Sequence, residues 1–308
     1  MQQGEFKVDS GTPAGASAPV QPKRPRELQD PLNFHLYHPL AWQLARRLAR
    51  TSATPNMVSV FGGLMVVLAA AAYAQPWYPW SALLGMALHM GWHVVDGADG
   101  DLARLTGRAS PIGEMVDGLC DYLSHLVLYL VLGWLLAGAG GFWHGWHGWA
   151  LVLAAGISHA IQSNHVEVQR RQYQYWVYGT PWLRGNHAGP DSKTSRSWAS
   201  GLVSLYLGVA SGMTPHALRI DAAVEAAKGD PARLDAIAAA VRAESPPLLR
   251  LCKVLGPNPR AVILGLSMLA GSPLWYLLYQ TLVLNALLAL SVRRHNAAAR
   301  RIATVIGA

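Results

Sequence analysis

The sequence is poor in charged side chains. Only 14% of its 308 residues are Asp, Glu, Lys or Arg, whereas 52% are hydrophobic. Soluble domains carry about 25% charged residues, so this composition argues against two soluble domains. The mean hydropathy is also positive. The shortage of charge therefore predicts a membrane protein with several spans.

Cysteine is nearly absent as well, since the chain has only Cys120 and Cys252. This pair forms neither a metal-ligand motif nor a disulfide framework, and we expect both thiols to be reduced and structural. The chain lacks the repeated unit that builds solenoids. Its first residues lack an apolar core after a basic start, so they do not resemble a signal peptide.

Basic residues outnumber acidic ones and give a formal net charge of +8. They gather at the ends of apolar segments and in polar connections. This distribution fits loops that face anionic lipid better than it fits a nucleic-acid-binding stripe. We therefore expect membrane lipids as neighbours and no nucleic-acid partner.

We expect six membrane-spanning helices, because apolar segments alternate with polar or turn-forming ones. These segments are residues 57–74, 81–95, 112–136, 149–164, 261–270 and 274–292. An even number of spans puts both termini on one side. The basic clusters fall on that side too, and the positive-inside rule makes it cytoplasmic. The short apolar run 202–209 is not counted, since a seventh span would place the last basic cluster outside.

The polar segments suggest a division of the chain around these spans. Residues 1–28 read as a disordered cytoplasmic tail, and 29–53 as an amphipathic helix on the membrane surface, with a simple basic flank as the alternative. Residues 54–298 form the transmembrane catalytic domain, which contains a cytoplasmic or interfacial helical insert at 186–250. Residues 299–308 are a C-terminal tail. The predicted fold is all-α, an integral protein of the plasma or bacterial inner membrane.

One acidic stretch stands inside this apolar sequence. Asp96 and Asp99 are three residues apart, and Asp117 and Asp121 are four apart. On a helix, each spacing stacks its pair on one face. A short turn joins the two segments, so the pairs can face each other across a helical hairpin. Carboxylates beside membrane spans are costly and mark functional sites.

The chemistry of this stretch favours a metal and a diphosphate. Four converging carboxylates cannot all stay ionised without positive charge between them, and oxygen ligands suit magnesium, manganese or calcium. Glycines beside the acids leave room for a ligand or a close helix. Arg104 offers a bidentate donor for phosphate. Helix caps, a proton relay or a cation pathway are the alternative interpretations.

The same stretch resembles the signature of the CDP-alcohol phosphotransferases (the CDP-alcohol phosphatidyltransferase family). That signature reads Asp-x-x-Asp-Gly-x-x-Ala-Arg, eight residues, then Gly-x-x-x-Asp-x-x-x-Asp. Its positions are filled by Asp96, Asp99, Gly100, Ala103, Arg104, Gly113, Asp117 and Asp121. The resemblance extends to the six-span plan, and it does not cover 186–250.

The resemblance implies a centre of two ions, Mg²⁺ or Mn²⁺. Asp96 and Asp117 would bridge both ions, with Asp99 on one ion and Asp121 on the other. Asp121 would also be the general base that deprotonates the acceptor hydroxyl, which then attacks the β-phosphorus and releases CMP. The residues implied in binding the CDP moiety are Gly100, Ala103, Arg104, Gly113, Ser110 and Asn56, with the segment 56–59 as a secondary contact.

Members of this family join CDP-diacylglycerol to polar alcohols, or CDP-choline and CDP-ethanolamine to diacylglycerol. We expect CDP-diacylglycerol as the donor, whereas the alcohol acceptor stays open. A homodimer is a further expectation. The alternative function is a divalent-cation transporter or binding protein that uses the acidic hairpin as its ion site. A phosphorylated acceptor needs basic residues, for which the candidates are Arg170, Arg171, Lys193, Arg196 and Arg260.

Three further polar residues lie close to the motif. Asp101 occupies an unconstrained motif position, and we expect it to face solvent. His89 and His93 are four residues apart upstream of the motif. They could line a cavity or bind metal, but packing inside the bundle is the favoured interpretation.

Overall fold

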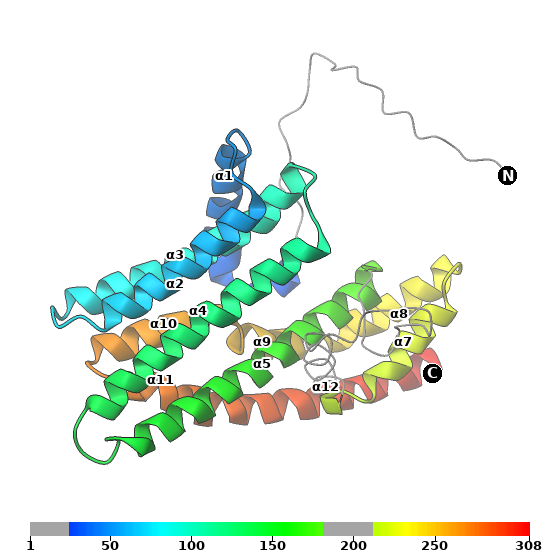
Figure 1. Cartoon of the computed structure of the whole chain (residues 1–308). Coiled ribbons are helices and arrows are strands. Elements are labelled where there is room, and N and C mark those ends of the chain that lie inside the picture. Colours follow the sequence, from blue (N-terminus) through cyan, green and yellow to red (C-terminus); the bar gives the residue numbers. More distant parts are fainter. Residues whose placement is uncertain (1–24, 181–211) are drawn as a thin grey trace, which may run out of the picture.

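The computed structural model describes residues 25–180 and 212–308, and the regular structure of these residues is entirely helical. The predicted all-α class is therefore confirmed. Helices α2 and α3 run side by side, and α4 packs against both α2 and α5 (Figure 1). The bounds of these four helices are α2 Pro55–Tyr73, α3 Trp80–Leu105, α4 Pro111–Gly138 and α5 Trp146–Tyr178.

Proline and a capping hydroxyl mark the start of two of these helices. Thr54 Oγ1 accepts the backbone N–H of Met57 at 3.3 Å, and Pro55 takes the first position of α2. Ser110 caps α4 in the same way, with the N–H of Gly113 at 3.1 Å. These caps satisfy N–H groups that have no partner inside the helix. Both helix starts are thus set by local sequence.

The second part of the chain begins with short helices and ends with one long rod. In the rod, α11 (Leu274–Leu278) continues through a π-helical turn (Tyr279–Val283) into α12 (Leu284–Ile306). The short helices α7, α8 and α9 lie beside the end of α5 and α12 (Figure 1). The bounds of the short helices are α7 Ala217–Ala226, α8 Pro231–Glu244, α9 Pro246–Val254 and α10 Pro257–Leu269.

Helices α7, α8 and α9 and the end of α12 share a hydrophobic core with the end of α5. Ile220 of α7 and Ile237 of α8 are buried in it, together with Trp176 of α5. The described part of the predicted insert 186–250 is therefore made of short packed helices. Residues 186–211, with the short apolar run that they contain, lie outside the described residues.

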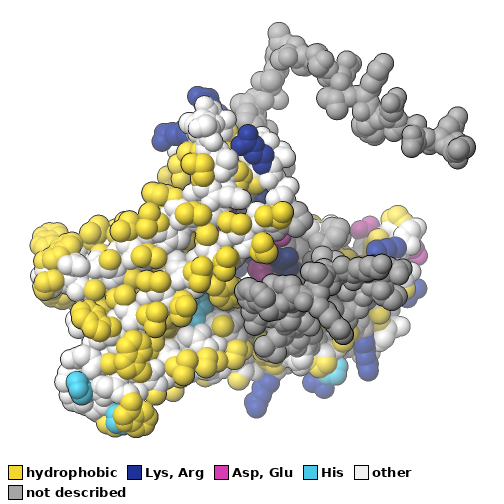
Figure 2. All heavy atoms as spheres, in the orientation of Figure 1, with side chains coloured by type: hydrophobic (Ala, Val, Ile, Leu, Met, Phe, Trp, Pro, Cys, Tyr) yellow, Lys and Arg dark blue, Asp and Glu magenta, His cyan; other side chains and the backbone are white. Residues whose placement is uncertain are grey.

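Three helices have the length and apolar composition needed to cross a membrane, and they are Pro55–Tyr73, Ile112–Gly138 and Leu274–Ile306. They expose large apolar side chains such as Phe61 and Leu123. Figure 2 shows hydrophobic side chains spread over the face that α2, α3 and α4 form. Apolar surface of this extent is stable in lipid rather than in water. The chain is an integral membrane protein.

The other predicted spans have a different character. With 13 residues, α10 is about 20 Å long, whereas the hydrocarbon core is about 30 Å thick. Helices α3 and α5 are long enough, but they carry buried polar side chains such as Asp99 and Gln162. Neighbouring helices shield such groups, so composition alone does not identify these helices as spans. The six-span topology and its sidedness stay predictions.

A helix does lie in the predicted amphipathic segment 29–53. It is α1 (His38–Leu48), and a π-helical turn, Asn33–Tyr37, precedes it. Ala41 and Ala45 are fully buried against α3, whereas the arginines on the opposite face are exposed. One apolar and one basic face fit an interfacial helix, and the location of α1 on the membrane surface stays a prediction.

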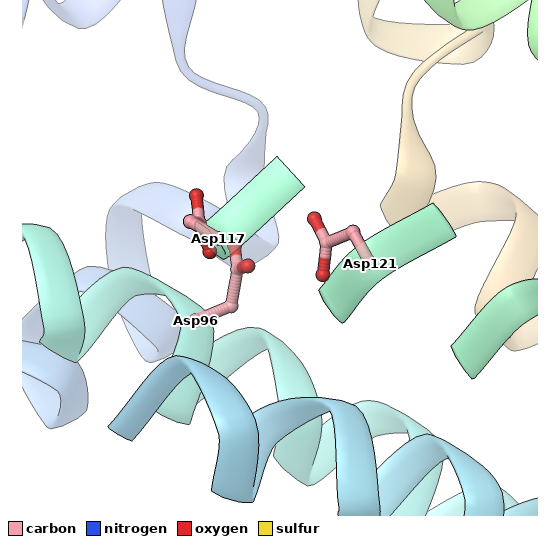
Figure 3. A group of neighbouring side chains, drawn as sticks. All are labelled: Asp96, Asp117 and Asp121. Carbon is pink, nitrogen blue, oxygen red and sulfur yellow. The ribbon is translucent and has the colours of Figure 1, made fainter. Parts of the chain in front are cut away.

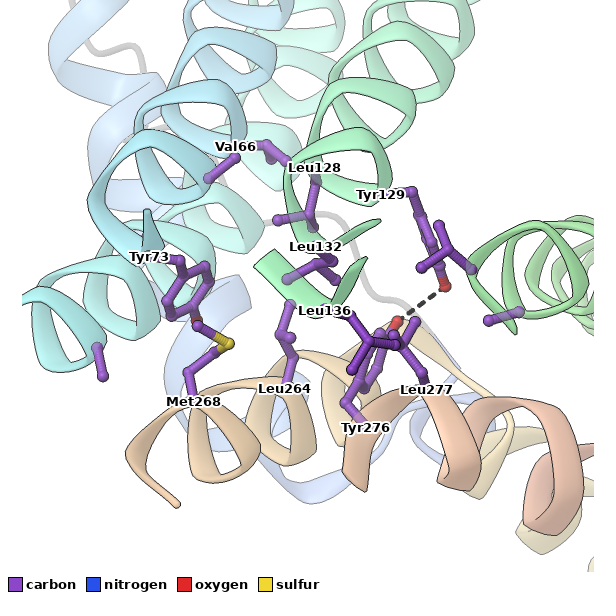
Figure 4. Packing of buried hydrophobic residues seen from close by; sticks show 14 of the residues in the cluster. Val66, Tyr73, Leu128, Tyr129, Leu132, Leu136, Leu264, Met268, Tyr276 and Leu277 are labelled. Carbon is purple, nitrogen blue, oxygen red and sulfur yellow. Dashed lines mark hydrogen bonds between the residues drawn. The ribbon is translucent and has the colours of Figure 1, made fainter. Parts of the chain in front are cut away.

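A second hydrophobic core lies between α2, α4, α10 and α11 (Figure 4). Leu132 of α4, Leu264 of α10 and Leu277 of α11 are fully buried in it. At its edge, the hydroxyls of Tyr129 and Tyr276 are 3.0 Å apart. This core holds α4 against the C-terminal helices and so sets the position of its acidic N-terminal half.

Candidate functional site

The hairpin of α3 and α4 brings three motif aspartates together. Asp96 of α3 faces Asp117 of α4, and Asp121 lies one turn further along α4 (Figure 3). One carboxylate oxygen from each residue lies within 4.8 Å of those of the other two, and all three residues are half-buried. The spacing inferred from the sequence therefore does place these side chains on facing helix edges.

Asp99, the fourth motif aspartate, lies next to this group, but its side chain contacts α2. Its side chain is buried, and its Oδ2 accepts a hydrogen bond from Ser59 Oγ of α2 at 2.6 Å. The carboxyl group of Asp117 lies beside it. Ser59 lies in the segment 56–59, which the sequence had singled out as a secondary contact. Asp99 is therefore linked to the three-carboxylate group through Asp117.

Three residues predicted to bind the CDP moiety meet at the start of α4. Ser110 caps the helix through the N–H of Gly113. A Cβ atom placed on Gly113 would lie 3.3 Å from Ser110 Oγ and 3.6 Å from Asn56 Oδ1. Asn56 of α2 thus reaches the first turn of α4, where the helix dipole favours an anion.

The other three residues predicted to bind the CDP moiety lie at the end of α3. A Cβ atom on Gly100 would lie 3.5 Å from Arg104 Nη1. The carbonyl of Ala103 accepts the N–H of Arg108 at 2.9 Å, which closes the turn after the helix. Arg104 forms an ion pair with Asp101, yet 47% of its side chain is exposed. Its guanidinium therefore keeps donors for a phosphate.

The expectation that Asp101 faces solvent is wrong, because the side chain is 1% exposed. Asp101 lies on the face of α3 that also carries Ala98 and Leu102, and α1 covers this face. Because Ala98 and Leu102 are apolar, helical periodicity could have predicted from the sequence that this face of α3, with Asp101, is buried. The ion pair with Arg104, three residues on, keeps the buried carboxylate partnered.

The histidines upstream of the motif are packed inside the bundle. His89 and His93 are buried, and both ring systems lie against Trp92, at 5.9 and 4.5 Å between ring centroids. A third imidazole, which the sequence interpretation missed, is His125. Its ring contacts His89, and its Nδ1–H donates to the carbonyl of Asp121 at 2.8 Å.

The basic residues considered for a phosphorylated acceptor are in different settings. Arg170 and Arg171 both form ion pairs with Glu167, whereas Lys193 and Arg196 lie outside the described residues. Arg260 is buried inside the bundle, 3% exposed, so it is not an ordinary charge of a cytoplasmic loop.

The chemistry of the donor set fits a divalent cation. Ionised carboxylates this close repel one another, and the repulsion grows as water is excluded. A set made only of carboxylate oxygens suits a hard cation such as Mg²⁺, Mn²⁺ or Ca²⁺. The carboxylate oxygens of Asp96, Asp117 and Asp121 lie close enough to one another to bind the same ion. The identity of the metal does not follow from this geometry.

Comparison with known proteins agrees with the geometry. Residues 52–182 match the model of the CDP-alcohol phosphatidyltransferase family. A curated relative is the archaetidylinositol phosphate synthase of Aeropyrum pernix, which is 36% identical over 98 residues. That match covers 30% of this chain and 47% of the relative, so it spans about half of the relative's length. Residues 52–182, less than half of this chain, are therefore similar to the CDP-alcohol phosphatidyltransferase family.

Proposed function

We propose that this protein transfers a substituted phosphate group from a CDP-activated lipid to an alcohol, with release of CMP. The observation that carries the proposal is the convergence of Asp96, Asp117 and Asp121 within 4.8 Å, inside the segment that matches the family. The name of the curated relative, a synthase of a lipid carrying inositol phosphate, supports transfer of a phospholipid head group.

The aspartates would hold two divalent cations, Mg²⁺ or Mn²⁺. Asp96 and Asp117, which face each other across the hairpin, would contact both ions. Asp99 would turn from Ser59 toward one ion, and Asp121 would hold the other. When bound, such ions neutralise the diphosphate and stabilise charge on the attacking and leaving oxygens.

Asp121 would also act as the general base. It lies at one end of the acidic row, one turn beyond Asp117. Removal of the hydroxyl proton lets the oxygen attack the β-phosphorus, and CMP leaves. Leu128 and Leu132, which follow Asp121 on α4, are buried in the hydrophobic core and hold this helix in place.

The CDP moiety would lie between the start of α4 and the end of α3. Asn56, Ser110 and Gly113 form the first side of this site, where Gly113 leaves space that a side chain would fill. Gly100, Ala103 and Arg104 form the second side. The apolar surfaces of α2 and α4 flank the site, and they suit the acyl chains of CDP-diacylglycerol.

The test is CMP release by the purified protein in lipid nanodiscs. CDP-diacylglycerol is supplied with Mg²⁺ or Mn²⁺ and a panel of alcohols: glycerol phosphate, inositol phosphate, inositol, serine and choline. We expect CMP with at least one alcohol and about 10³-fold less CMP from the Asp121→Asn variant. Vesicles that take up Mn²⁺ while no alcohol yields CMP would show a cation transporter instead. A cytoplasmic site, termini on the same side and a homodimer stay predictions.

A further inference from the structure

The indole of Trp92 lies between the acidic hairpin and the buried histidines. Trp92 stands one turn before Asp96 on α3, and it is 6% exposed. Its ring packs against His93, with 4.5 Å between the ring centroids, and against His125 of α4, with 4.8 Å. His125 follows Asp121 by one helical turn and donates Nδ1–H to its carbonyl. The ring of Trp92 therefore lies against the turn of α4 that begins with Asp121.

Two adjacent glycines of α2 bring this ring and the backbone of α4 together. A Cβ atom on Gly62 would lie 3.4 Å from Trp92 Cδ1 and 3.8 Å from its Nε1. A Cβ atom on Gly63 would lie 3.3 Å from the carbonyl oxygen of Cys120, the residue before Asp121. Because both side chains are missing, α3 and α4 can approach the same point of α2. Trp92 and Asp121 thus meet where three helices are in close contact.

The contact joins an indole to a carboxyl group. The side chain of Trp92 lies beside the carboxyl group of Asp121. The indole has a single polar group, an N–H that can only donate, and a buried indole N–H normally has an acceptor. A carboxylate has two oxygens that can each accept more than one hydrogen bond. A donor on one oxygen of Asp121 therefore leaves the other oxygen for an ion or a hydroxyl.

Asp121 depends on such a partner because its nearest charged neighbours repel it. Carboxylate oxygens of Asp96, Asp117 and Asp121 lie within 4.8 Å of one another, and like charges at this distance push the side chains apart. Trp92 is fixed by the helices around it, so it can restrict the rotation of the carboxylate. Reacting groups and metal ligands depend on neighbours that lock their orientation in this way.

We propose that Trp92 is a positioning residue, whose indole N–H donates to Asp121 and fixes its carboxylate in the orientation that takes the acceptor proton and holds an ion. The proposal rests on the proposed function. Trp92 acts through Asp121 and takes no part in the proton transfer itself. A hydrogen bond to a charged group is stronger than one between neutral groups, so its loss should be measurable.

Trp176 on α5 provides a matched control. Trp92 and Trp176 are each 6% exposed. Trp176 Nε1 donates to Asp221 Oδ1 of α7 at 2.6 Å, in the hydrophobic core that α5 shares with α7, α8 and α9. A change to Phe removes the same atoms at both positions, including one donor to an aspartate. A general cost of losing a buried indole therefore appears in both variants.

The experiment measures kcat and KM in lipid nanodiscs, for CDP-diacylglycerol and for the alcohol of the panel that gives the most CMP. We expect Trp92→Phe to lower kcat about tenfold and to change both KM values less than about twofold, since it removes no group that binds either substrate. Trp92→Tyr, whose hydroxyl can donate, should keep kcat within about threefold of wild type. Trp176→Phe should change kcat less than about twofold.

Two further measurements separate positioning from packing. In the Asp121→Asn background, Trp92→Phe should lower the remaining CMP release less than about twofold, because the residue through which Trp92 acts is already altered. Calorimetric titration with Mn²⁺ alone should show about a threefold loss of affinity for Trp92→Phe, no larger than the loss for Asp121→Asn. Trp176→Phe should bind Mn²⁺ like wild type.

A kcat of Trp92→Phe equal to that of wild type or of Trp176→Phe would overturn the proposal, and so would a loss that persists in full in the Asp121→Asn background. A Trp92→Phe protein that does not fold, while Trp176→Phe does, would make Trp92 structural and have the same consequence. These outcomes leave CMP release by wild type intact, so they spare the proposed function. If wild type releases no CMP, the proposed function fails, and the Mn²⁺ titration decides whether Trp92 orients Asp121.

Discussion

The acidic hairpin and the polar cluster between α5, α10 and α12 are both polar regions inside an apolar bundle, yet they differ in how their groups are paired. In the cluster, Gln162 Nε2 donates to Asn285 Oδ1 at 2.7 Å, and its Oε1 accepts from Gln280 Nε2 at 2.6 Å and Arg260 Nη2 at 3.2 Å. In the hairpin, acceptor oxygens of three carboxylates face one another.

This difference separates a structural role from a functional one. A buried amide whose donors meet acceptors stabilises the fold without any ligand. Carboxylates that face one another destabilise the empty fold and become favourable when a cation enters. Substitution in the hairpin should therefore abolish activity at little cost in stability. Substitution in the cluster should lower stability first.

The largest effect is expected for Asp121→Asn. Loss of a general base lowers the rate by about 10²–10⁴-fold, so CMP release should fall by about 10³-fold. The midpoint of thermal unfolding in detergent should stay the same or rise, because one repelling charge is removed. A clear drop in that midpoint would mean that Asp121 is structural, and the contrast between the two regions would fail.

Gln162→Leu should have the largest effect on stability. The change leaves the partners of Gln162 on Arg260 and Gln280 unsatisfied, and both of these side chains are buried. Each such group costs about 1–3 kcal/mol. We expect a loss of about 3 kcal/mol in the free energy of unfolding. Thermal and denaturant unfolding in the same detergent measures it.

The control is the same substitution on the same helix, Gln174→Leu, where the side chain is only partly buried. It should change the free energy of unfolding by less than about 0.5 kcal/mol. Equal destabilisation by the two variants would show that the buried side chain of Gln162 stabilises the fold no more than the partly buried side chain of Gln174.

Asp117→Asn should weaken metal binding more than Asp121→Asn does. Asp117 faces Asp96 across the hairpin and lies next to Asp99, so it would contact both ions. We expect about a tenfold loss of Mn²⁺ affinity for Asp117→Asn and a smaller loss for Asp121→Asn. Calorimetric titration with Mn²⁺ measures both, and the reverse ranking would contradict the assigned roles.

The smallest effect concerns an ion pair outside both regions. Arg301 donates to both oxygens of Glu244, with Nη2 to Oε2 at 2.7 Å, and this contact lowers the pKa of Glu244. A lowered folded-state pKa stabilises the fold above the unfolded value, about 4.3, and the gain is lost as pH falls through the folded-state pKa.

Because the Arg301 side chain is 57% exposed, water screens the pair and its contribution should be below about 1 kcal/mol. Unfolding midpoints of wild type and Glu244→Gln should therefore differ slightly at pH 7 and converge near pH 3. A difference that persists or grows on acidification would rule out this linkage.

Helix geometry explains how far the sequence predicted the site. Asp96, Asp117 and Asp121 meet because residues three or four apart share a helix face and a short turn joins the two helices. The caps at Thr54 and Ser110 are equally local. Asp101 was misplaced because its exposure depends on α1, which packs against α3 from a distant part of the chain.

The sequence by itself determined the helical class, the apolar spans of α2, α4 and the C-terminal rod, and the acidic hairpin, since each depends on contacts within a few residues. Only the tertiary structure decided the rest. The partners of Arg260 and the contact of Glu27 with Tyr173 of α5 join residues about 100 or more positions apart. Such contacts form only when whole helices pack, and no local pattern of residues specifies them.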